Sequence, residues 1–533
     1  MTEKPSGFLS LVLHCHLPFV RHPEHDYFLE ENWLYEALFE TYLPLLARCE
    51  EMVEKSIPFK LALSISPTLL SMWKDPLLQS RALRYADDLL ELLEEEKNRI
   101  QSQRSFQPVA EMYLQRISSY REKLEKQYGG DISRGFKALQ DLGHVDLITC
   151  GATHGFFPLL ASRPQALRAQ VETALVFHEE CFGQRPKGFW LPECGYQPGL
   201  ETLLKEQGVG YFFLDTHGLL HGKPRPRYGT FAPIQCPDGT EVFARDLESS
   251  REVWSSKEGY PGDPAYREFY RDLGFDLPEA DLEPYLKPEG VRRFTGLKYY
   301  RVTGPGPEKE PYDPKAALLQ AKAHAKDFLQ KRQAQVQKVA AWMDRPPQLT
   351  FMFDAELFGH WWFEGPDFLY FLFEETKYSG SKLKWVTPGE YLQDAPTLQG
   401  LEPAASSWGE GGYSEFWLNE ANDWIYPLLQ KACERMEKAA QDHPLAKGLT
   451  LRALNQAARE LLLAQASDWA FMMKTGHHRS YAEGRVRGHL ANLDQLLEQV
   501  KGGKVWEEIL EGLEEKNNLF FNLTYKIYAK PRK

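Results

Sequence analysis

Short apolar runs recur along residues 1–395 and predict buried strands of a parallel sheet. They occupy 8–13, 59–65, 145–150, 188–191, 211–215 and 349–354. Most of them are separated by long amphipathic, charge-rich stretches, such as 79–104 and 110–127, whose pattern predicts helices. Alternating strands and helices are typical of a (β/α) barrel or an open α/β sheet.

The placement of polar residues favours the barrel. Histidine, hydroxyl or carboxylate side chains stand at or just after the end of nearly every predicted strand: His14, His16, Ser64, Ser66, Thr153, His154, Glu193, Asp215, His217 and Asp354. Barrel enzymes build their active sites at the C-terminal ends of the strands. We therefore expect residues 1–395 to form a catalytic barrel with its active site at this end.

Two regions depart from the alternation. Residues 218–315 are rich in Gly, Pro and Tyr, and we interpret them as loops and a small insertion that cover the mouth of the active site. Within 400–533 the periodicity of 420–441, 450–474 and 481–500 predicts helices, and hence an all-α C-terminal domain.

Composition narrows the function classes. A formal net charge of -12 argues against a nucleic-acid-binding surface, which needs a basic patch. No run is long and apolar enough to predict a membrane span or a signal peptide. The 7 cysteines form no C-x-x-C pair, which indicates reduced thiols and a cytoplasmic location. Aromatic residues make up 13%, which fits either a large core or a cleft in which sugar rings stack.

Two carboxylates carry the strongest chemical signal. Glu193 lies in G-F-W-L-P-E-C-G-Y (188–196), where a buried strand leads into a Pro/Gly turn, although a solvated loop glutamate would fit the same pattern. Asp354 ends a strand in F-M-F-D-A-E-L-F-G-H-W-W (351–362), where it could instead cap the next helix. Two carboxyls at one barrel mouth are the minimum for glycosyl transfer, one as nucleophile and one as acid and base.

Five segments together resemble the conserved regions of glycoside hydrolase family 57, most closely those of its 1,4-α-glucan branching enzymes. They are H-C-H-L-P-F (14–19), A-T-H-G-F-F-P-L-L (152–160), 188–196, 353–362 and S-W-G-E-G-G-Y with W-L-N-E (407–420). The resemblance implies a distorted (β/α)7 barrel, a helical C-terminal domain and a retaining mechanism without metal or cofactor. It also implies that Glu193 is the nucleophile and Asp354 the acid/base.

The resemblance further implies a set of glucan contacts. Branching enzymes of this family bind glucan through residues that match Arg245, Gly262, Trp408 and Asp468. Some relatives have a glutamine contact where this chain has His477, and branching enzymes of this family have a tyrosine on a mobile loop, for which Tyr228 in P-R-P-R-Y-G-T-F is the candidate. We add further residues near the strand ends as expected sugar contacts: His14, His16, His154, Trp190 and Trp362.

The expected partners are an α-glucan donor and an α-glucan acceptor, and the sequence leaves the oligomeric state open. The same chemistry with water as the acceptor would make the protein an α-amylase, and a 4-α-glucanotransferase is a further relative. A different class, a barrel metallohydrolase, would use His14, His16, His154, His217 and Asp354 as ligands. A non-catalytic glucan-binding protein would have no need of paired carboxylates.

Overall fold

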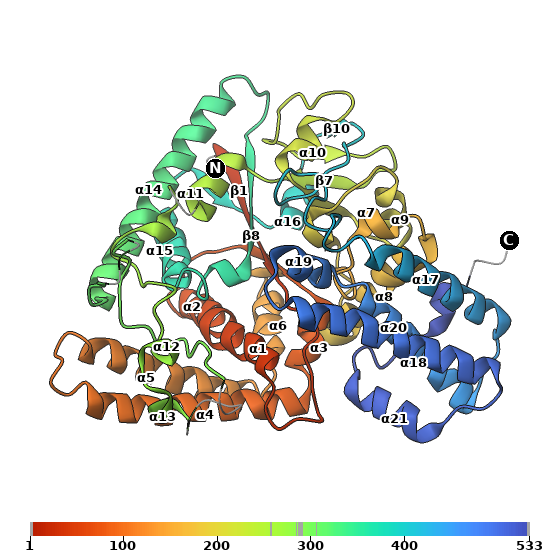
Figure 1. Cartoon of the computed structure of the whole chain (residues 1–533). Coiled ribbons are helices and arrows are strands. Elements are labelled where there is room, and N and C mark those ends of the chain that lie inside the picture. The colour runs from red at the N-terminus through yellow and green to blue at the C-terminus, as the bar shows by residue number, and fades with distance from the viewer. Residues whose placement is uncertain are drawn as a thin grey trace.

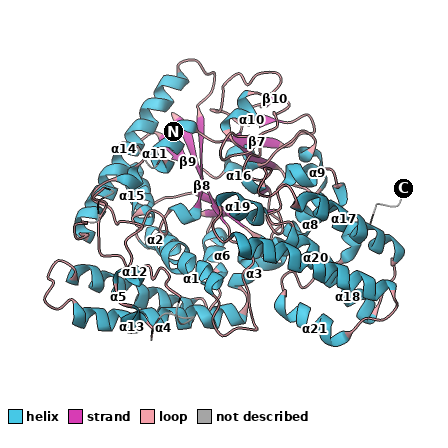
Figure 2. Ribbon diagram, viewed as in Figure 1, coloured by secondary structure: helices cyan, strands magenta, loops and turns pink. Residues whose placement is uncertain are grey.

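A computed structural model describes residues 4–529, except 256–257, 284, 286–290, 305 and 307. Its centre is a parallel sheet surrounded by helices (Figure 2). In spatial order the parallel strands are β7 (Glu241–Ala244), β5 (Tyr211–Leu214), β4 (Gly188–Trp190), β3 (Val145–Cys150), β2 (Leu61–Ile65), β1 (Gly7–Cys15) and β8 (Gln348–Asp354). The six predicted strands are confirmed, and β7 is an addition that lies within 218–315.

The two edges of this sheet meet, so the seven strands form a loosely closed barrel. Arg245, directly after β7, forms a parallel bridge with Thr350 of β8, and the backbone N–H of Asp246 donates to the Thr350 carbonyl at 2.9 Å. The barrel expected from the sequence is therefore present in distorted form. Short strands extend the sheet outside it: β6 (Ile234–Gln235) antiparallel to β7, β10 (Gln399–Gly400) beside β6, and β9 (Leu383–Trp385) beside β1.

Strand register decides which polar residues meet. His14 is level with Ser64 of β2 on one side and with Asp354 of β8 on the other. Below this level the barrel interior is apolar and packed, with Val12, Ala62, Ile148, Trp190, Phe213, Phe243 and Met352 in one buried cluster. Because parallel strands present alternate residues to the interior, this packing closes the barrel floor and leaves the polar groups at its mouth.

Helices surround the barrel and extend from it (Figure 1). Those before the C-terminal region are α1 (Asn32–Ala37), α2 (Leu43–Glu54), α3 (Pro67–Trp73), α4 (Pro76–Arg99), α5 (Gln107–Glu122), α6 (Ser133–Asp141), α7 (Phe157–Leu160), α8 (Pro164–Phe182), α9 (Leu200–Glu206), α10 (Thr216–Leu220), α11 (Leu247–Trp254), α12 (Leu273–Asp276), α13 (Glu279–Leu282), α14 (Pro314–Ala340), α15 (Gly365–Tyr378) and α16 (Pro388–Gln393). None of the helices in the described part of the chain is long and apolar enough to cross a membrane.

The described part of 218–315 does more than cover the mouth. It supplies strand β7 and helix α11 to the barrel, while α12 and α13 lie beside α4 and α5 in Figure 1. Arg267 Nη1 in this region donates to the Tyr113 hydroxyl of α5 at 3.1 Å. The expected insertion therefore packs partly on the flank of the barrel.

The C-terminal region is helical, as predicted, with α17 (Ile425–Asp442), α18 (Gly448–Ala464), α19 (Ser467–Thr475), α20 (Arg479–Lys501) and α21 (Glu507–Lys516). The single helix expected over 450–474 is wrong, because the chain turns between α18 and α19. There Ala466 is extended and pairs with Gly155, and the Ser467 N–H donates to the His154 carbonyl at 3.0 Å. A Cβ at Gly155 would lie 2.8 Å from Leu160 Cδ1 and 3.2 Å from the Gln465 carbonyl oxygen, so a larger residue would require these groups to shift. Figure 1 shows α19 at the centre of the molecule beside the strands.

Candidate active site

A cleft of ≈ 1180 Å³ opens at the C-terminal ends of the strands. It is lined by four carboxyls, three imidazoles, one guanidinium and a group of aromatic rings: Glu193, Asp354, Glu356, Asp468, His14, His16, His154, Arg245, Trp254, Trp361, Trp408, Phe416, Trp417 and Phe471, together with Gly409. The structure thus brings together the two predicted catalytic carboxyls and six of the predicted binding residues.

Glu193 enters the cleft from a strained turn. Strand β4 ends at Trp190, and both Glu193 and Cys194 have left-handed backbone angles, with φ of 59° and 49°. Residues other than glycine rarely adopt this backbone conformation, and backbone strain of this kind is often found at functional sites. The Glu193 carbonyl accepts from the Trp408 backbone N–H at 2.9 Å, which fixes the turn against the S-W-G segment.

The Glu193 carboxylate is held at both oxygens. Trp408 Nε1 donates to Oε2 at 2.7 Å, and the Ser467 hydroxyl donates to Oε1 at 3.1 Å. Burial raises the pKa of Glu193 to about 7, the Trp408 hydrogen bond opposes this, and the Asp468 carboxylate adds to it. Only 17% of the Glu193 side chain is exposed, so its carboxyl group is largely desolvated. The two hydrogen bonds fix its orientation.

Asp354 is the last residue of β8 and faces the same cleft. Burial raises its pKa well above the ordinary value, and the neighbouring carboxyls of Glu356 and Glu193 raise it further. Arg245 opposes these effects from its position over the Trp408 ring, at 5.1 Å from the centroid, where it also contacts Asp215 at 3.2 Å. Asp354 therefore keeps its proton more readily than an exposed aspartate does.

Two buried histidines join Glu193 to the barrel wall. His14 Nε2 lies 3.0 Å from His154 Nε2, and His154 Nδ1 lies 2.9 Å from the Ser467 hydroxyl. On the other side, His14 Nδ1 lies 3.0 Å from the Ser64 hydroxyl. Burial holds the pKa of both imidazoles well below the ordinary value, so both rings are neutral.

His16 and Asp468, which both line the cleft, lie within hydrogen-bond distance of each other. His16 Nε2 lies 3.1 Å from Asp468 Oδ1, and the His16 backbone N–H donates to Glu356 at 3.2 Å. Burial opposes charge on the ring, but the carboxylates of Asp468, Glu193 and Glu356 together raise the pKa of His16. Glu356, which also accepts from the Tyr42 hydroxyl, was not predicted to belong to the site, although it lies two positions after Asp354.

The aromatic wall includes residues that sequence reasoning did not assign to the site. Trp254 at the end of α11, Trp361 and Phe471 of α19 are substantially exposed and line the cleft. A flat exposed ring suits the apolar face of a sugar. Trp361 could have been predicted, because it belongs to the W-W pair of the motif at 351–362, but Phe471 lies outside the motifs quoted above.

Five predicted binding residues do not line the cleft. Trp362 is 1% exposed and packs on Phe368 at 4.8 Å, so it is not placed to contact a sugar, and its neighbour Trp361 lines the cleft instead. Trp190 is fully buried beneath the cleft, stacked on His14 at 4.8 Å. Gly262 and His477 are exposed outside the cleft.

Tyr228 is the fifth of these residues, and the structure places it far from the cleft in which a glucan contact was predicted for it. The segment after α10 runs to the opposite end of the barrel, where the Phe231 carbonyl accepts from Gln348, the first residue of β8, at 2.9 Å. Strand β8 has 7 residues, so at a rise of ~3.3 Å per residue this end lies ~20 Å from Asp354.

Two triplets of side chains among the described residues have spacing that would suit a metal ion: His14, Cys150 and His154, and His16, His154 and Asp468. In both triplets hydrogen bonds already occupy the atoms concerned, namely His14 Nε2 with His154 Nε2, and His16 Nε2 with Asp468. Hydrogen bonds between these side chains are therefore sufficient to explain why they lie so close together. His217, the other histidine in the metal hypothesis, binds the Gly412 carbonyl at 2.8 Å and does not line the cleft.

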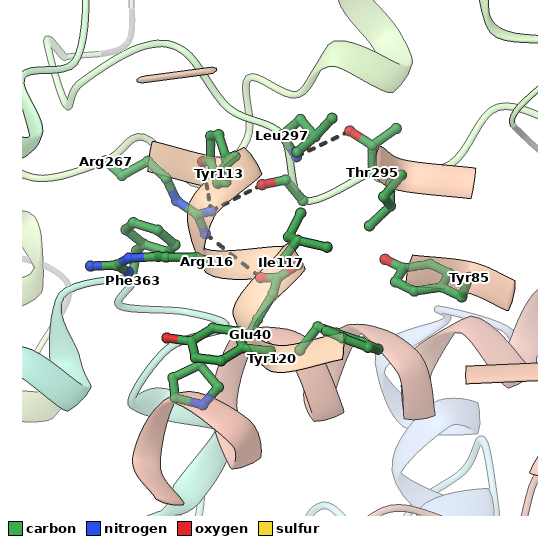
Figure 3. A pocket seen from close by; sticks show the side chains of 14 residues that line it. Glu40, Tyr85, Tyr113, Arg116, Ile117, Tyr120, Arg267, Thr295, Leu297 and Phe363 are labelled. Carbon is green, nitrogen blue, oxygen red and sulfur yellow. Dashed lines mark hydrogen bonds and ion pairs between the residues drawn. The ribbon is translucent and has the colours of Figure 1, made fainter. Parts of the chain in front are cut away.

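A second cavity lies away from the strand ends (Figure 3). Tyrosines from α4 and α5 line it together with Arg267, whose guanidinium reaches Glu40 at 3.6 Å and the Gly296 carbonyl at 3.1 Å. Glu40 in turn lies 3.2 Å from His360, the neighbour of Trp361. This cavity contains one carboxylate already paired with a guanidinium, and therefore cannot carry the paired-carboxyl chemistry.

Comparison with known proteins identifies the family. The model of glycosyl hydrolase family 57 matches residues 10–282, and the model of the C-terminal region of 1,4-α-glucan branching enzymes matches residues 428–528. A 1,4-α-glucan branching enzyme of Thermococcus kodakarensis is 32% identical over 96% of this chain and 77% of its own length.

Solved structures agree over almost the whole chain. An α-amylase of Thermotoga maritima, AmyC, is 40% identical with a TM-score of 0.92, covering 99% of this chain and 100% of that one. A family 57 branching enzyme of Pyrococcus horikoshii is 33% identical with a TM-score of 0.89, covering 99% of this chain and 97% of that one. From its barrel, its cleft and these matches, the chain belongs to glycosyl hydrolase family 57.

Proposed function

We propose that this chain is a 1,4-α-glucan branching enzyme in which Glu193 is the nucleophile and Asp354 the acid/base. The observation that carries the chemistry is the contrast between two carboxyls in one cleft. Glu193 accepts hydrogen bonds at both oxygens, which oppose the effect of burial and hold its pKa at about 7, whereas burial and two neighbouring carboxyls raise the pKa of Asp354 well above its ordinary value. Such a division of roles is what a retaining glycosidic mechanism needs.

In the first step a Glu193 oxygen attacks the anomeric carbon and forms an ester bond with it. The bond from that carbon to O4 of the next sugar breaks, and Asp354 gives its proton to the departing O4. In the second step the Asp354 carboxylate takes the proton from a 6-hydroxyl of an acceptor glucan. The acceptor O6 attacks the same carbon, the ester bond breaks, and Glu193 is released as a carboxylate with an α-1,6 branch formed.

Two observations favour branching, in which the acceptor is a sugar, over hydrolysis, in which it is water. The relatives named branching enzymes and the branching-enzyme C-terminal match at 428–528 favour it. The exposed rings of Trp254, Trp361 and Phe471 line the same cleft as the carboxyl pair and offer three stacking surfaces for a donor and an acceptor chain. Exclusion of water by the bound acceptor would then favour transfer.

The second candidate is an α-amylase, favoured by the 40% identity to a Thermotoga maritima protein of that name. It has the same first step, with water as the acceptor in the second. We also propose a cytoplasmic setting, supported by the 7 cysteines, all of them described and unpaired. A role in the synthesis of a glycogen-like polymer is proposed from the relatives named branching enzymes.

The deciding experiment incubates purified protein with amylose and counts two products. New α-1,6 linkages, measured by proton NMR and by chain release with a debranching enzyme, support branching, whereas reducing ends without new linkages support the amylase. Glu193→Gln and Asp354→Asn should each abolish both products, and Glu95→Gln on the exposed face of α4 serves as the matched control. Near-normal turnover in Glu193→Gln would overturn the assignment of the nucleophile.

A further inference from the structure

The nucleophile of the barrel is held partly by the C-terminal helices. Ser467 is the first residue of α19, and its position depends on the break after α18, where Ala466 pairs with Gly155. Its backbone N–H binds the His154 carbonyl at 3.0 Å, which fixes the serine relative to β3. Its hydroxyl then lies 3.1 Å from Glu193 Oε1 and 2.9 Å from His154 Nδ1.

These contacts form one hydrogen-bond chain from Glu193 to Ser64 whose donors can be assigned in order. A carboxylate only accepts, so the Ser467 hydroxyl donates to Glu193 and must accept from His154 Nδ1–H. Because His154 is neutral, its Nε2 has a lone pair and accepts from His14 Nε2–H at 3.0 Å. His14 Nδ1 is then the acceptor for the Ser64 hydroxyl.

We propose that Ser467 is a positioning residue that holds Glu193 in its attacking orientation, and that Ser64, through His14 and His154, keeps the Ser467 hydroxyl pointed at the carboxylate. This proposal rests on the proposed role of Glu193 as nucleophile. Ser467 is 2% exposed and is not part of the cleft lining. It therefore acts through Glu193 and has no direct contact with a sugar in the cleft.

The geometry makes the hydroxyl hard to replace. Without it, the nearest donor on that side is His154 Nδ1, at 3.7 Å from Glu193 Oε1, which is beyond hydrogen-bond range. Oε2 would keep the Trp408 contact, but the carboxylate would be free to rotate about it. The ionised form would lose a donor, so the pKa of Glu193 would rise further.

The test measures cleavage of amylose across pH in Ser467→Ala and Ser467→Thr. The acidic limb of kcat/KM reports the free enzyme's essential base. In Ser467→Ala we expect it to move upward by about one pH unit, and kcat to fall about ten- to a hundredfold with little change in KM, because a hydrogen bond to a charged group is lost. The threonine variant retains the hydroxyl and should restore the limb. None of the variants substitutes the other titratable or charged groups at the carboxyl pair. These are His16, His154, Asp354 and Asp468, which also face Glu193, and Arg245, which faces Asp354.

Two further variants separate positioning from folding. Ser64→Ala removes the far end of the chain and should move the same limb in the same direction by a smaller amount. Ser66→Ala is the matched control, since this equally buried serine caps α3 by accepting from Leu69 N–H at 3.4 Å. It should lower the Tm and leave the pH profile unchanged.

An acidic limb that stays in place in both Ser467→Ala and Ser64→Ala would overturn the proposal, even if the activity of these variants were low. Counting every cleaved α-1,4 bond, whatever the acceptor, separates this outcome from failure of the proposed function. A wild type that forms no branches refutes only the branching, and an active Glu193→Gln refutes only the nucleophile assignment.

Discussion

The indole Nε1 of Trp408 donates a 2.7 Å hydrogen bond to Oε2 of Glu193, while the backbone N–H of the same tryptophan binds the Glu193 carbonyl. The indole also has Arg245 over its ring and Trp190 at its edge, with the ring centroids 5.2 Å apart. One residue from the loop after the barrel thus fixes both the backbone and the carboxylate of the proposed nucleophile.

Trp408→Phe should therefore impair the chemistry more than the binding of glucan. Phenylalanine keeps an aromatic face but has no donor, so kcat should fall about ten- to a hundredfold, the range expected for loss of a hydrogen bond to a charged group. Steady-state kinetics on amylose measure this effect. Trp342→Phe, at an exposed tryptophan outside the cleft, is the control. An unchanged kcat in Trp408→Phe would mean that the contact does not orient Glu193.

Glu193→Gln should stabilise the protein at high pH and not at low pH. The pKa of Glu193 is raised from 4.5 to about 7 in the folded chain, so folding favours the protonated form. Its contribution to stability is present below pH 4.5 and is lost as the pH rises through 7. Glutamine stays neutral throughout, so it avoids a destabilisation of about 3 kcal/mol above pH 7.

The measurement compares the Tm of Glu193→Gln and wild type at pH 5 and pH 8. A Tm difference of a few degrees should appear at pH 8 and largely vanish at pH 5. Any constant effect of the amide on the Trp408 and Ser467 hydrogen bonds cancels in this comparison. An equal difference at both values would show that Glu193 ionises normally in the folded protein.

Chelators should leave the activity unchanged. The ring nitrogens of His14 and His154 are engaged in the hydrogen-bond chain to Glu193, and proton transfer by Asp354 needs no Lewis acid. Activity is measured before and after dialysis against EDTA, with metal content determined in parallel. Stoichiometric zinc, with activity that disappears on its removal and returns on its addition, would support the metallohydrolase alternative instead.

Much of the barrel was predictable because apolar runs of four to seven residues indicate burial directly. Strand β7 was missed because E-V-F-A is short and lies in a Gly- and Pro-rich region. The break before α19 was missed because Gln465 and Ala466 are ordinary helix residues, and the extended backbone there comes from pairing with Gly155. That tertiary contact delivers Ser467 and Asp468 to the cleft, so part of the site could not be predicted from local pattern.

The catalytic pair was easier to predict than its surroundings. Glu193 and Asp354 follow strands, and strand ends define the active face of a barrel. Side-chain direction in irregular segments has no such rule, so local pattern does not show that Trp361 rather than Trp362 faces the cleft, or that Tyr228 lies at the far end of the barrel. The division into domains near residues 395–400 stays a prediction.

The adjacent tryptophans should respond to substitution in opposite ways. Trp361 is 54% exposed, lines the cleft and stacks on Phe269 at 4.5 Å, whereas Trp362 is buried in the core. Trp361→Ala should raise KM for amylose severalfold with little change in Tm. Trp362→Ala should cost about 3–5 kcal/mol of stability, as other large core truncations do. Kinetics and thermal denaturation of both variants test this, and the reverse pattern would contradict the placement of the two rings.

Tyr228→Ala should lower stability without changing the ratio of branching to hydrolysis. The tyrosine is 7% exposed and packs between Trp342, at 6.4 Å, and the guanidinium groups of Arg227 and Arg345, at 5.0 and 5.3 Å from its ring. These contacts lie in a groove bordered by β6 and the segment before β10, at the end of the barrel remote from Asp354.

Loss of the Tyr228 ring removes buried area and two cation–π contacts, so a destabilisation of about 2–4 kcal/mol is expected. Tyr228→Phe keeps the ring and its packing and is the matched control, which should behave like wild type in Tm. Product analysis on amylose should give the same number of α-1,6 linkages per cleaved α-1,4 bond in all three proteins. A lower ratio in Tyr228→Ala, with an unchanged Tm, would mean that residues 223–233 leave this groove and reach the cleft when glucan binds.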